Sequence, residues 1–101
     1  MNLFKSDGRY KWHSLGFHYI VEFRWADRSD REQYSRLIKY FKEIYGPDRE
    51  KVYDINPGLG RWVRNTNWLC EQNIQAKRRR IYLREESALT LALLSIENAQ
   101  S

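Results

Sequence analysis

The sequence has one cysteine, Cys70, among its 101 residues. A lone cysteine excludes a disulfide within the chain and a metal site built from several thiolates, and it fits a reducing compartment. No apolar run approaches the roughly 20 residues that a membrane-spanning helix needs. The opening "MNLFKSDGRY" also has no apolar signal-peptide core. We therefore expect a cytoplasmic protein that does not contact membranes.

Proline and glycine are scarce, and the sequence has neither internal repeats nor low-complexity segments. The two prolines, Pro47 and Pro57, both lie in the polar stretch "GPDREKVYDINPGLG", which is typical of a connection between elements. The "NPGLG" part lacks the Gly-Lys-Ser/Thr ending of a phosphate-binding loop, so it predicts only a turn. A chain of this length forms one domain, residues 1–101.

Aromatic residues and positive charge are plentiful. Aromatic residues make up 15% of the chain, and the formal net charge is +5 with an isoelectric point near 9.5. Large rings bury much area with few rotatable bonds, which suits a small core. A basic surface favours partners that carry phosphate or carboxylate groups.

The stretch "FHYIVEFRW", residues 17–25, alternates with the period of a half-buried strand. Its aromatic residues and Val21 share one face, whereas Glu22 and Arg24 share the other with His18 and Ile20. Burying an unpaired Glu22 or Arg24 would cost several kcal/mol, so the aromatic face should pack against the helices. The preceding "RYKWH" and "SLG" predict a short partner strand and a turn.

Residues 29–45 have helical spacing, with an apolar stripe from Tyr34 to Tyr45. Ser29 and Glu32 form a capping-box pattern at the start, and Gly46 with Pro47 predicts the end. Residues 60–71 predict a strand bent near 65–67, "QNIQAK" a hairpin connection, and residues 78–84 a final strand.

The segment from residue 85 onward predicts a second helix, with Leu89, Ala92, Leu93 and Ile96 facing inward. The element order is β-α-β-β-α, with a possible extra N-terminal strand. This order indicates the α+β class, a two-layer sandwich in which an antiparallel open sheet carries both helices on one face.

The basic run "KRRR" at the start of the last strand is the main candidate site. With Ile81 and Leu83 in the core, we expect the alternate side chains to lie on the open face of the sheet and to contact phosphate, with Tyr82 stacking on a base. The predicted nucleic-acid-binding residues are Lys77, Arg78, Arg79, Arg80, Tyr82, Arg84 and Arg24. Such contacts would give weak sequence specificity.

Two other interpretations of the basic run stay open. Arginine stems can cover apolar sheet edges and protect an edge strand from aggregation, or the run can dock an acidic protein. A protein-interaction module, as an inhibitor of a host complex or as a homodimer, is the alternative function. Its anchors would be Trp62, Trp68, Leu91 and Leu94, although core positions are favoured for the two tryptophans.

The sequence offers little for catalysis. His13 and His18 are an odd number of residues apart, which on a strand would place them on opposite faces, away from a shared metal. The acidic pairs at 27 and 30 and at 85 and 86 lie at helix starts, where they complement the helix dipole. Cys70 has no base beside it. We expect neither an enzyme nor a metal or cofactor site.

The C-terminal run "RRRIYLRE" followed by "ESALTLALLSI" resembles the ending of small uncharacterised accessory proteins of large tailed bacteriophages. The helix ending "YFKEIYGP" is similar to them as well, and together these segments cover about half the chain. The resemblance implies a phage accessory protein acting in the host cytoplasm. It implies binding to nucleic acid, to a nucleoprotein complex, or to a host transcription or defence complex.

Overall fold

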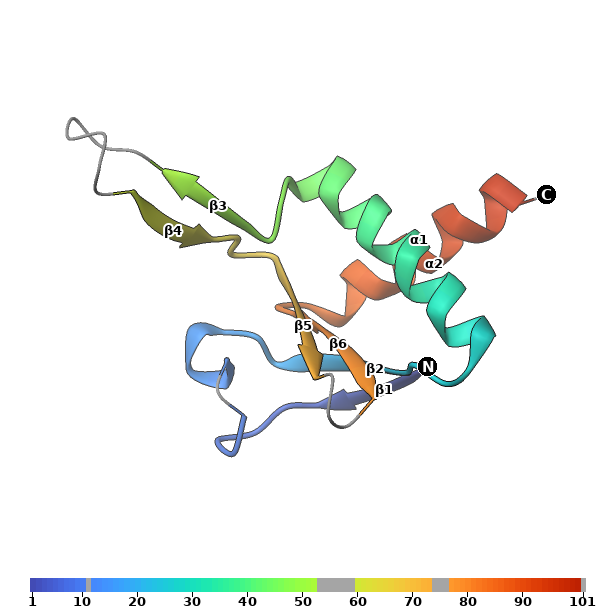
Figure 1. The fold of residues 1–101 in the computed structure, drawn as a ribbon, viewed down its shortest axis with the longest axis horizontal. Helices are drawn as coiled ribbons and strands as arrows, with labels where there is room; N and C mark the ends of the chain where they lie inside the picture. Colours follow the sequence, from blue (N-terminus) through green and yellow to red (C-terminus); the bar gives the residue numbers. More distant parts are fainter. Residues whose placement is uncertain (11, 53–59, 74–76, 101) are drawn as a thin grey trace.

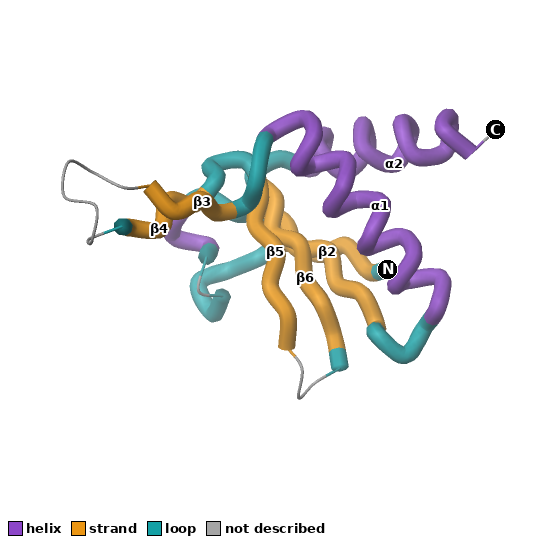
Figure 2. The backbone as a smooth tube through the Cα atoms, turned by 45° about the horizontal axis from the view of Figure 1, so that its top comes forward, coloured by secondary structure: helices purple, strands orange, loops and turns teal. Residues whose placement is uncertain are grey.

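The computed structural model describes residues 1–10, 12–52, 60–73 and 77–100. Its elements in chain order are β1 (Asn2–Lys5), the 3-10 turn η1 (His13–Leu15), β2 (Tyr19–Arg24), α1 (Arg28–Tyr45), β3 (Arg49–Val52), β4 (Arg61–Arg64), β5 (Trp68–Asn73), β6 (Arg78–Leu83) and α2 (Glu86–Gln100). A four-stranded antiparallel sheet has the order β1-β2-β6-β5. Both helices lie on one side of it (Figures 1 and 2). The predicted α+β class is confirmed.

The main core lies between this sheet and the helices. Val21 of β2 is opposite Ile81 of β6, and both side chains are fully buried. The helices contribute the other side of the core through Leu37, Phe41 and Leu89 among others. The strand residues alternate as expected, so every second side chain of β2 and β6 faces the helices, as Trp68 and Cys70 of β5 also do.

The helix α1 begins one residue earlier than predicted and has a different cap. Asp27 is the N-cap, and its side chain accepts a hydrogen bond from the Asp30 backbone amide at 3.2 Å. The predicted capping box from Ser29 is therefore wrong, because Ser29 already lies inside the helix. The predicted end is correct: Gly46 follows the last turn with a φ of 84°, a conformation that glycine adopts without steric strain.

The strand that precedes β2 comes from a different segment than predicted. Residues 2–5 form β1 and pair with β2, so that Leu3 is opposite Val21. The segment "RYKWH", predicted as a strand, instead forms an irregular turn that leads into η1, and Lys11 lies outside the described residues. The strand prediction fails here because no neighbouring strand pairs with the described residues of this segment to hold them extended. The Tyr10 and Trp12 side chains pack against the sheet instead.

The polar stretch of residues 46–60 contains a strand, β3, rather than a plain connection. Within the described residues, β3 and β4 pair with each other and with no other strand, with Arg49 opposite Arg64, and form a separate two-stranded sheet. This hairpin projects from the rest of the molecule (Figure 1), and we call residues 49–52 and 61–64 the arm. The predicted bend near 65–67 is confirmed, since β4 ends and β5 begins around it. Pro57 with most of "NPGLG", and residues 74–76 of the β5–β6 connection, lie outside the described residues.

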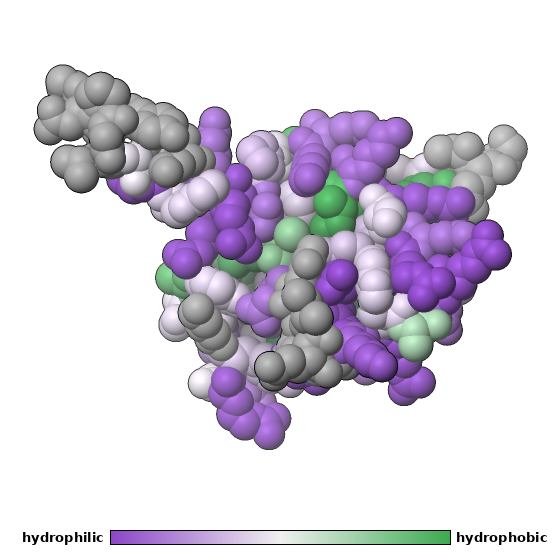
Figure 3. All heavy atoms as spheres, viewed as in Figure 1, coloured by the Kyte–Doolittle hydropathy of each residue, from purple (hydrophilic) through white to green (hydrophobic). Residues whose placement is uncertain are grey.

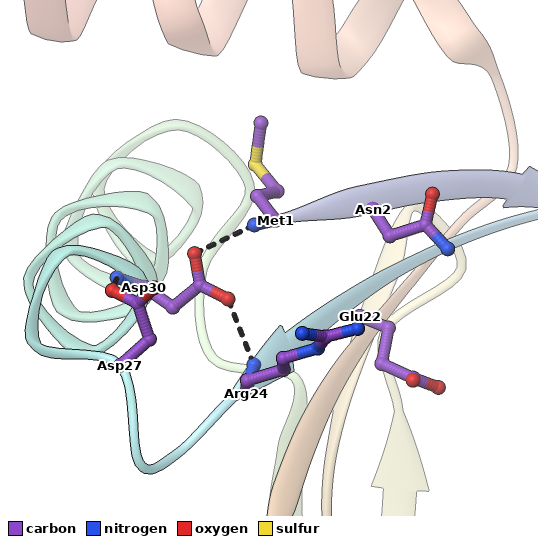
Figure 4. Close-up of a pocket in the computed structure, with 6 residues that line it drawn as sticks. All are labelled: Met1, Asn2, Glu22, Arg24, Asp27 and Asp30. Atoms are coloured by element: carbon purple, nitrogen blue, oxygen red, sulfur yellow. Dashed lines mark hydrogen bonds and ion pairs between the residues drawn. The ribbon is translucent and has the colours of Figure 1, made fainter.

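A buried carboxylate links the chain start to the start of α1. The two oxygens of Asp30, which is 7% exposed, accept hydrogen bonds from the Met1 ammonium at 2.6 Å and the Arg24 amide at 2.8 Å (Figure 4). Burial alone would raise the pKa of Asp30, but these two donors outweigh it and hold the pKa below its usual value.

Replacing Asp30 with asparagine is expected to lower the free energy of unfolding by about 1–3 kcal/mol at pH 7, because the new amide group would face a donor. Because the folded pKa is depressed, the stabilisation from the charged form is present above the unfolded pKa and disappears as the pH falls through the folded value. Urea denaturation should therefore show a larger difference from the natural protein at pH 7 than at pH 3, since the difference shrinks as the pH falls towards the folded pKa. Asp7→Asn, at an exposed ion pair with Arg9, serves as the control; an equal loss in both variants would contradict the prediction.

Candidate nucleic-acid interface

The basic run of β6 is divided between the two faces of the sheet. Arg79 is opposite Phe23 and lies on the helix side, whereas Arg78 and Arg80 lie on the other side, opposite Arg24 and Glu22. This follows from the two-residue repeat of a strand. Four consecutive cations therefore do not form one surface.

The sheet face opposite the helices is not open. It carries a second buried cluster made of Phe17, Ile20, Leu69 and Tyr82, against which Phe4, Tyr10 and Trp12 pack. The chain between β1 and β2 folds back over this face, and the Ser6 amide donates to the His18 carbonyl at 2.8 Å. Phe17 belongs to this cluster because β2 begins only at Tyr19, so the alternation does not extend back to it. The predicted open face is therefore a second core.

Tyr82 lies inside this second core and is 3% exposed. The predicted exposure of its ring is wrong, since the segment before β2 covers it, and no base can stack on it in this fold. The Tyr82 hydroxyl donates to Glu71 at 3.3 Å. Burial raises the pKa of Tyr82, so the phenol stays protonated and keeps donating at neutral pH.

The Arg80 guanidinium contacts a carboxylate and an aromatic ring. Its Nε and Nη2 atoms both contact one carboxylate oxygen of Glu22 at 2.9 Å, and its guanidinium lies over the Tyr10 ring at 5.5 Å. The side chain is only 15% exposed. Arg80 therefore stabilises the cover of the sheet, and the predicted phosphate contact would require breaking this ion pair.

Arg84 also connects separate parts of the fold, although its side chain is exposed. Its Nε donates to the Thr66 carbonyl at 2.8 Å and its Nη2 to the Leu15 carbonyl at 3.1 Å. The guanidinium also lies over Phe17. Gly16 allows this close approach, because a Cβ there would lie 2.5 Å from an Arg84 nitrogen and the Gly16 φ is 95°. Arg84 thus joins the segment before β2 to the start of β5.

Three of the predicted phosphate contacts lie near one end of the sheet. Lys77 and Arg24 are exposed, and Arg24 is directly opposite Arg78, an arrangement of like charges that is unfavourable by itself. However, Arg24 lines a hollow together with Glu22, Asp27 and Asp30 (Figure 4). These acids offset much of the positive charge, and the phosphate-binding role of the three cations stays a prediction.

The four predicted partner-binding residues differ sharply in exposure. Trp68 is fully buried and stacks on Phe41, so its predicted role as an anchor is wrong. Trp62 is 64% exposed on the arm, and Leu91 and Leu94 of α2 are 57% and 52% exposed. The structure therefore leaves three of the four accessible to a partner.

The arm brings together cations that the sequence analysis missed. Every residue of β4, which reads Arg-Trp-Val-Arg, is exposed, and Arg49 lies across the hairpin from Arg64. The Arg64 guanidinium lies 4.4 Å from the centre of the Trp12 ring, and Arg49 donates to the Cys70 carbonyl at 3.4 Å. These contacts fix the base of the arm against the body. The signal in the sequence is "GRWVR", in which two arginines flank Trp62, and the core position favoured for this tryptophan is wrong.

A groove lies where the arm joins the body. It has a volume of about 440 Å³ and is lined by apolar groups from Tyr45, Pro47 and Val63 and by the polar side chains of Glu50, Arg64, Asn65, Thr66 and Asn67. The Asn65 side-chain amide donates to the Tyr45 carbonyl at 2.7 Å. This groove is continuous with the cationic strand β4, since Val63 and Arg64 belong to both.

The described residues contain little that resembles a catalytic site. Burial raises the pKa of Cys70 to about 11, so the thiol stays protonated at neutral pH. The His13 and His18 rings lie 5.0 Å apart, so their predicted separation is wrong, because His13 lies in a 3-10 turn rather than a strand. Ser6 donates its hydroxyl to the Phe17 carbonyl and so accepts from His13, which prevents this histidine from acting as its base.

A search of the described residues finds no group of three or more histidine, cysteine or acidic residues placed to hold a metal ion. Over their described residues, neither α1 nor α2 combines the length and apolar content needed to cross a bilayer. No protein-family model, curated protein or solved structure matches the chain.

Proposed function

We propose that the protein is a non-enzymatic accessory protein that binds nucleic acid, and that it does so through the arm rather than through the sheet face. The observation that carries this proposal is Trp62, a residue that is 64% exposed in the strand β4, Arg-Trp-Val-Arg, of the projecting hairpin. Among the large hydrophobic residues that are exposed in the described part of the chain, Trp62 has the highest exposed fraction, and hydrophilic side chains occupy much of the face seen in Figure 3.

The chemistry of the arm suits a single strand. An exposed indole stacks on an unpaired base, and each such stack contributes about 1–3 kcal/mol with little dependence on sequence. Arg49, Arg61 and Arg64 are exposed and supply positive charge at both ends of the hairpin strands. Arg49 and Arg64 also contact Cys70 and Trp12 of the body, but because both remain exposed they can still donate to phosphate oxygens, two oxygens to one guanidinium. A net charge of +5 attracts polyanions from a distance. Duplex binding would use only the cations, so a single strand is expected to bind more tightly.

Fluorescence anisotropy with a labelled 20-nucleotide single strand and its duplex tests this proposal. Trp62→Ala should weaken single-strand binding by about 5- to 150-fold, the loss of one base stack. Three phosphate contacts predict that log affinity falls with log salt at a slope of about −2 to −3. Arg61→Ala should reduce the magnitude of that slope by about one, since it removes one contact.

Arg9→Ala is the matched control, because Arg9 is an exposed arginine outside the arm that pairs with Asp7. Trp62→Phe should keep most of the affinity. If Arg61→Ala and Arg9→Ala weakened binding equally, the contact would be a general effect of net charge and the arm would have no special role. Affinity that does not change with salt would also overturn the proposal.

The exposed leucines of α2 support a second candidate function, a protein-interaction module. Leu91 and Leu94 are both more than half exposed on one helix, and such a patch is typical of a contact with another protein or a second copy of the chain. Self-association measured by light scattering, abolished by Leu91→Asp and Leu94→Asp and unaffected by Trp62→Ala, would favour this function over the first.

A further inference from the structure

A second groove lies at the start of α1, away from the arm. It is lined by Trp25, which follows β2, and by Arg31, Glu32, Ser35 and Arg36 of α1. Its volume is about 540 Å³ and it is widely open to solvent, which is within the range of small-molecule sites. The groove and the arm lie at opposite ends of the 18-residue helix α1 (Figure 1), so one ligand in the groove does not reach the arm.

The groove carries an excess of positive charge. Arg31 and Arg36 line it, and the Arg79 guanidinium lies 4.0 Å from the centre of the Trp25 ring. Among the described residues that line it, Glu32 is the acidic one, and its carboxylate already accepts a hydrogen bond from Arg28 at 3.2 Å. The remaining arginines therefore act on the groove with little opposition from negative charge.

Arg31 and Arg79 are held in position beside the indole. Arg31 donates from Nη1 to the Trp25 carbonyl at 2.7 Å, which holds its guanidinium beside the indole. The Nε atom of Arg79 is buried and has no hydrogen-bond partner among the described residues. The Arg79 guanidinium adds positive charge beside the indole, although its buried Nε atom is out of reach of a ligand in the groove.

The aromatic part of the groove is also fixed in place. The Tyr34 ring meets the Trp25 ring edge-on at 5.6 Å and 89°, and Arg79 covers a face of the indole. Trp25 is only partly buried. An indole that is held in this way loses little freedom when a flat ligand packs against it.

We propose that this groove binds a nucleoside phosphate, with the base against Trp25 and the phosphate held by Arg31, Ser35 and Arg36. Ser35 follows Arg31 by four residues, so these two side chains lie one turn apart on the same face of α1, and Arg36 lines the groove beside them. Two guanidinium groups and a hydroxyl can donate to the oxygens of a phosphate monoester, and the base would stack on the indole. The site differs from the arm in residues and location, so it stands or fails separately from the proposed function.

Titration with adenosine monophosphate, followed by the indole N–H resonances in ¹H–¹⁵N NMR spectra, tests this inference. The Trp25 resonance should shift while that of Trp62 stays in place, and adenosine without phosphate should bind at least about tenfold more weakly, the loss of one charged hydrogen-bonded group. Arg36→Ala, at an exposed position, should also weaken binding by about tenfold, whereas Arg9→Ala should leave it unchanged.

Several outcomes would overturn the inference. Inorganic phosphate binding as tightly as adenosine monophosphate would reduce the groove to an anion site without base recognition. A phosphoserine peptide binding more tightly than the nucleotide would assign the groove to a phosphorylated protein. A nucleotide affinity unaffected by Arg36→Ala, or a Trp25 resonance that does not move, would rule out the site. Single-strand binding by the arm would survive each of these results.

Discussion

Replacing Trp68 with alanine is expected to lower the free energy of unfolding by about 3–5 kcal/mol, the usual cost of removing a large buried ring. Trp68 is fully buried, and its ring stacks on Phe41 with the ring centres 5.6 Å apart and the planes 28° apart. Its Nε1 atom donates to the Gly46 carbonyl at 3.0 Å, next to the end of α1. The substitution therefore opens a cavity and also leaves that carbonyl without its donor. Urea denaturation followed by circular dichroism measures the loss.

Trp62→Ala is the matched control for this prediction, since it removes the same side chain from an exposed strand. We expect it to change the free energy of unfolding by no more than about 0.5 kcal/mol, as for most surface substitutions, while it weakens nucleic-acid binding. The two tryptophans thus separate stability from binding. Equal losses of stability in the two variants would mean that Trp62 is buried in solution and that the arm does not project.

Much of the fold was predictable because two segments carry strong periodic signals. The alternation through β2 and the apolar stripe of α1 each define a buried face without help from distant residues. The split of the stretch from residue 60 into β4 and β5 was also predictable, from the polar residues at the bend. These features are local in sequence, so one chain is enough to reveal them.

The second core was not predictable in the same way. Glu22 and Arg24 made the sheet face opposite the helices look solvated, although Ile20 on that same face is fully buried. It is covered by Tyr10, Trp12 and their neighbours, which lie in an irregular segment with no repeat of its own. Whether this sheet face is exposed depends on how the irregular segment folds back over it, and such long-range packing leaves no periodic pattern in the sequence.

The division of the arginines has the same physical origin. A guanidinium group in the sequence looks like a free cation, yet several arginines of this chain lie over aromatic rings: Arg64 over Trp12, Arg79 over Trp25, Arg80 over Tyr10 and Arg84 over Phe17. Contacts of this kind bury the planar face of the cation and contribute to packing. The interpretation that arginine stems cover apolar surface therefore explains Arg80 and Arg84 better than phosphate binding does.

Removing Arg80 is expected to destabilise the protein strongly, because it leaves Glu22 without its partner. The two side chains are 15% and 26% exposed and meet at 2.9 Å, and losing one member of a largely buried pair costs more than the pair itself contributes. Arg80→Ala should lower the free energy of unfolding by about 2–4 kcal/mol, slightly less than for a fully buried pair. Lys77→Ala, at an exposed position of the same basic run, should have little effect.

A double-mutant cycle identifies the cause. If the loss comes from the unpaired Glu22, then Glu22→Ala combined with Arg80→Ala should cost about 1–3 kcal/mol less than the sum of the two single substitutions. Additive losses would mean that Arg80 stabilises the cover through its other contacts, such as the Tyr10 ring, rather than through Glu22. At a temperature where Arg80→Ala is still folded, its affinity for a single strand should stay within about twofold of that of the natural protein, since a structural arginine makes no phosphate contact. A large drop in affinity with the fold intact would restore β6 as the interface and remove the arm from that role.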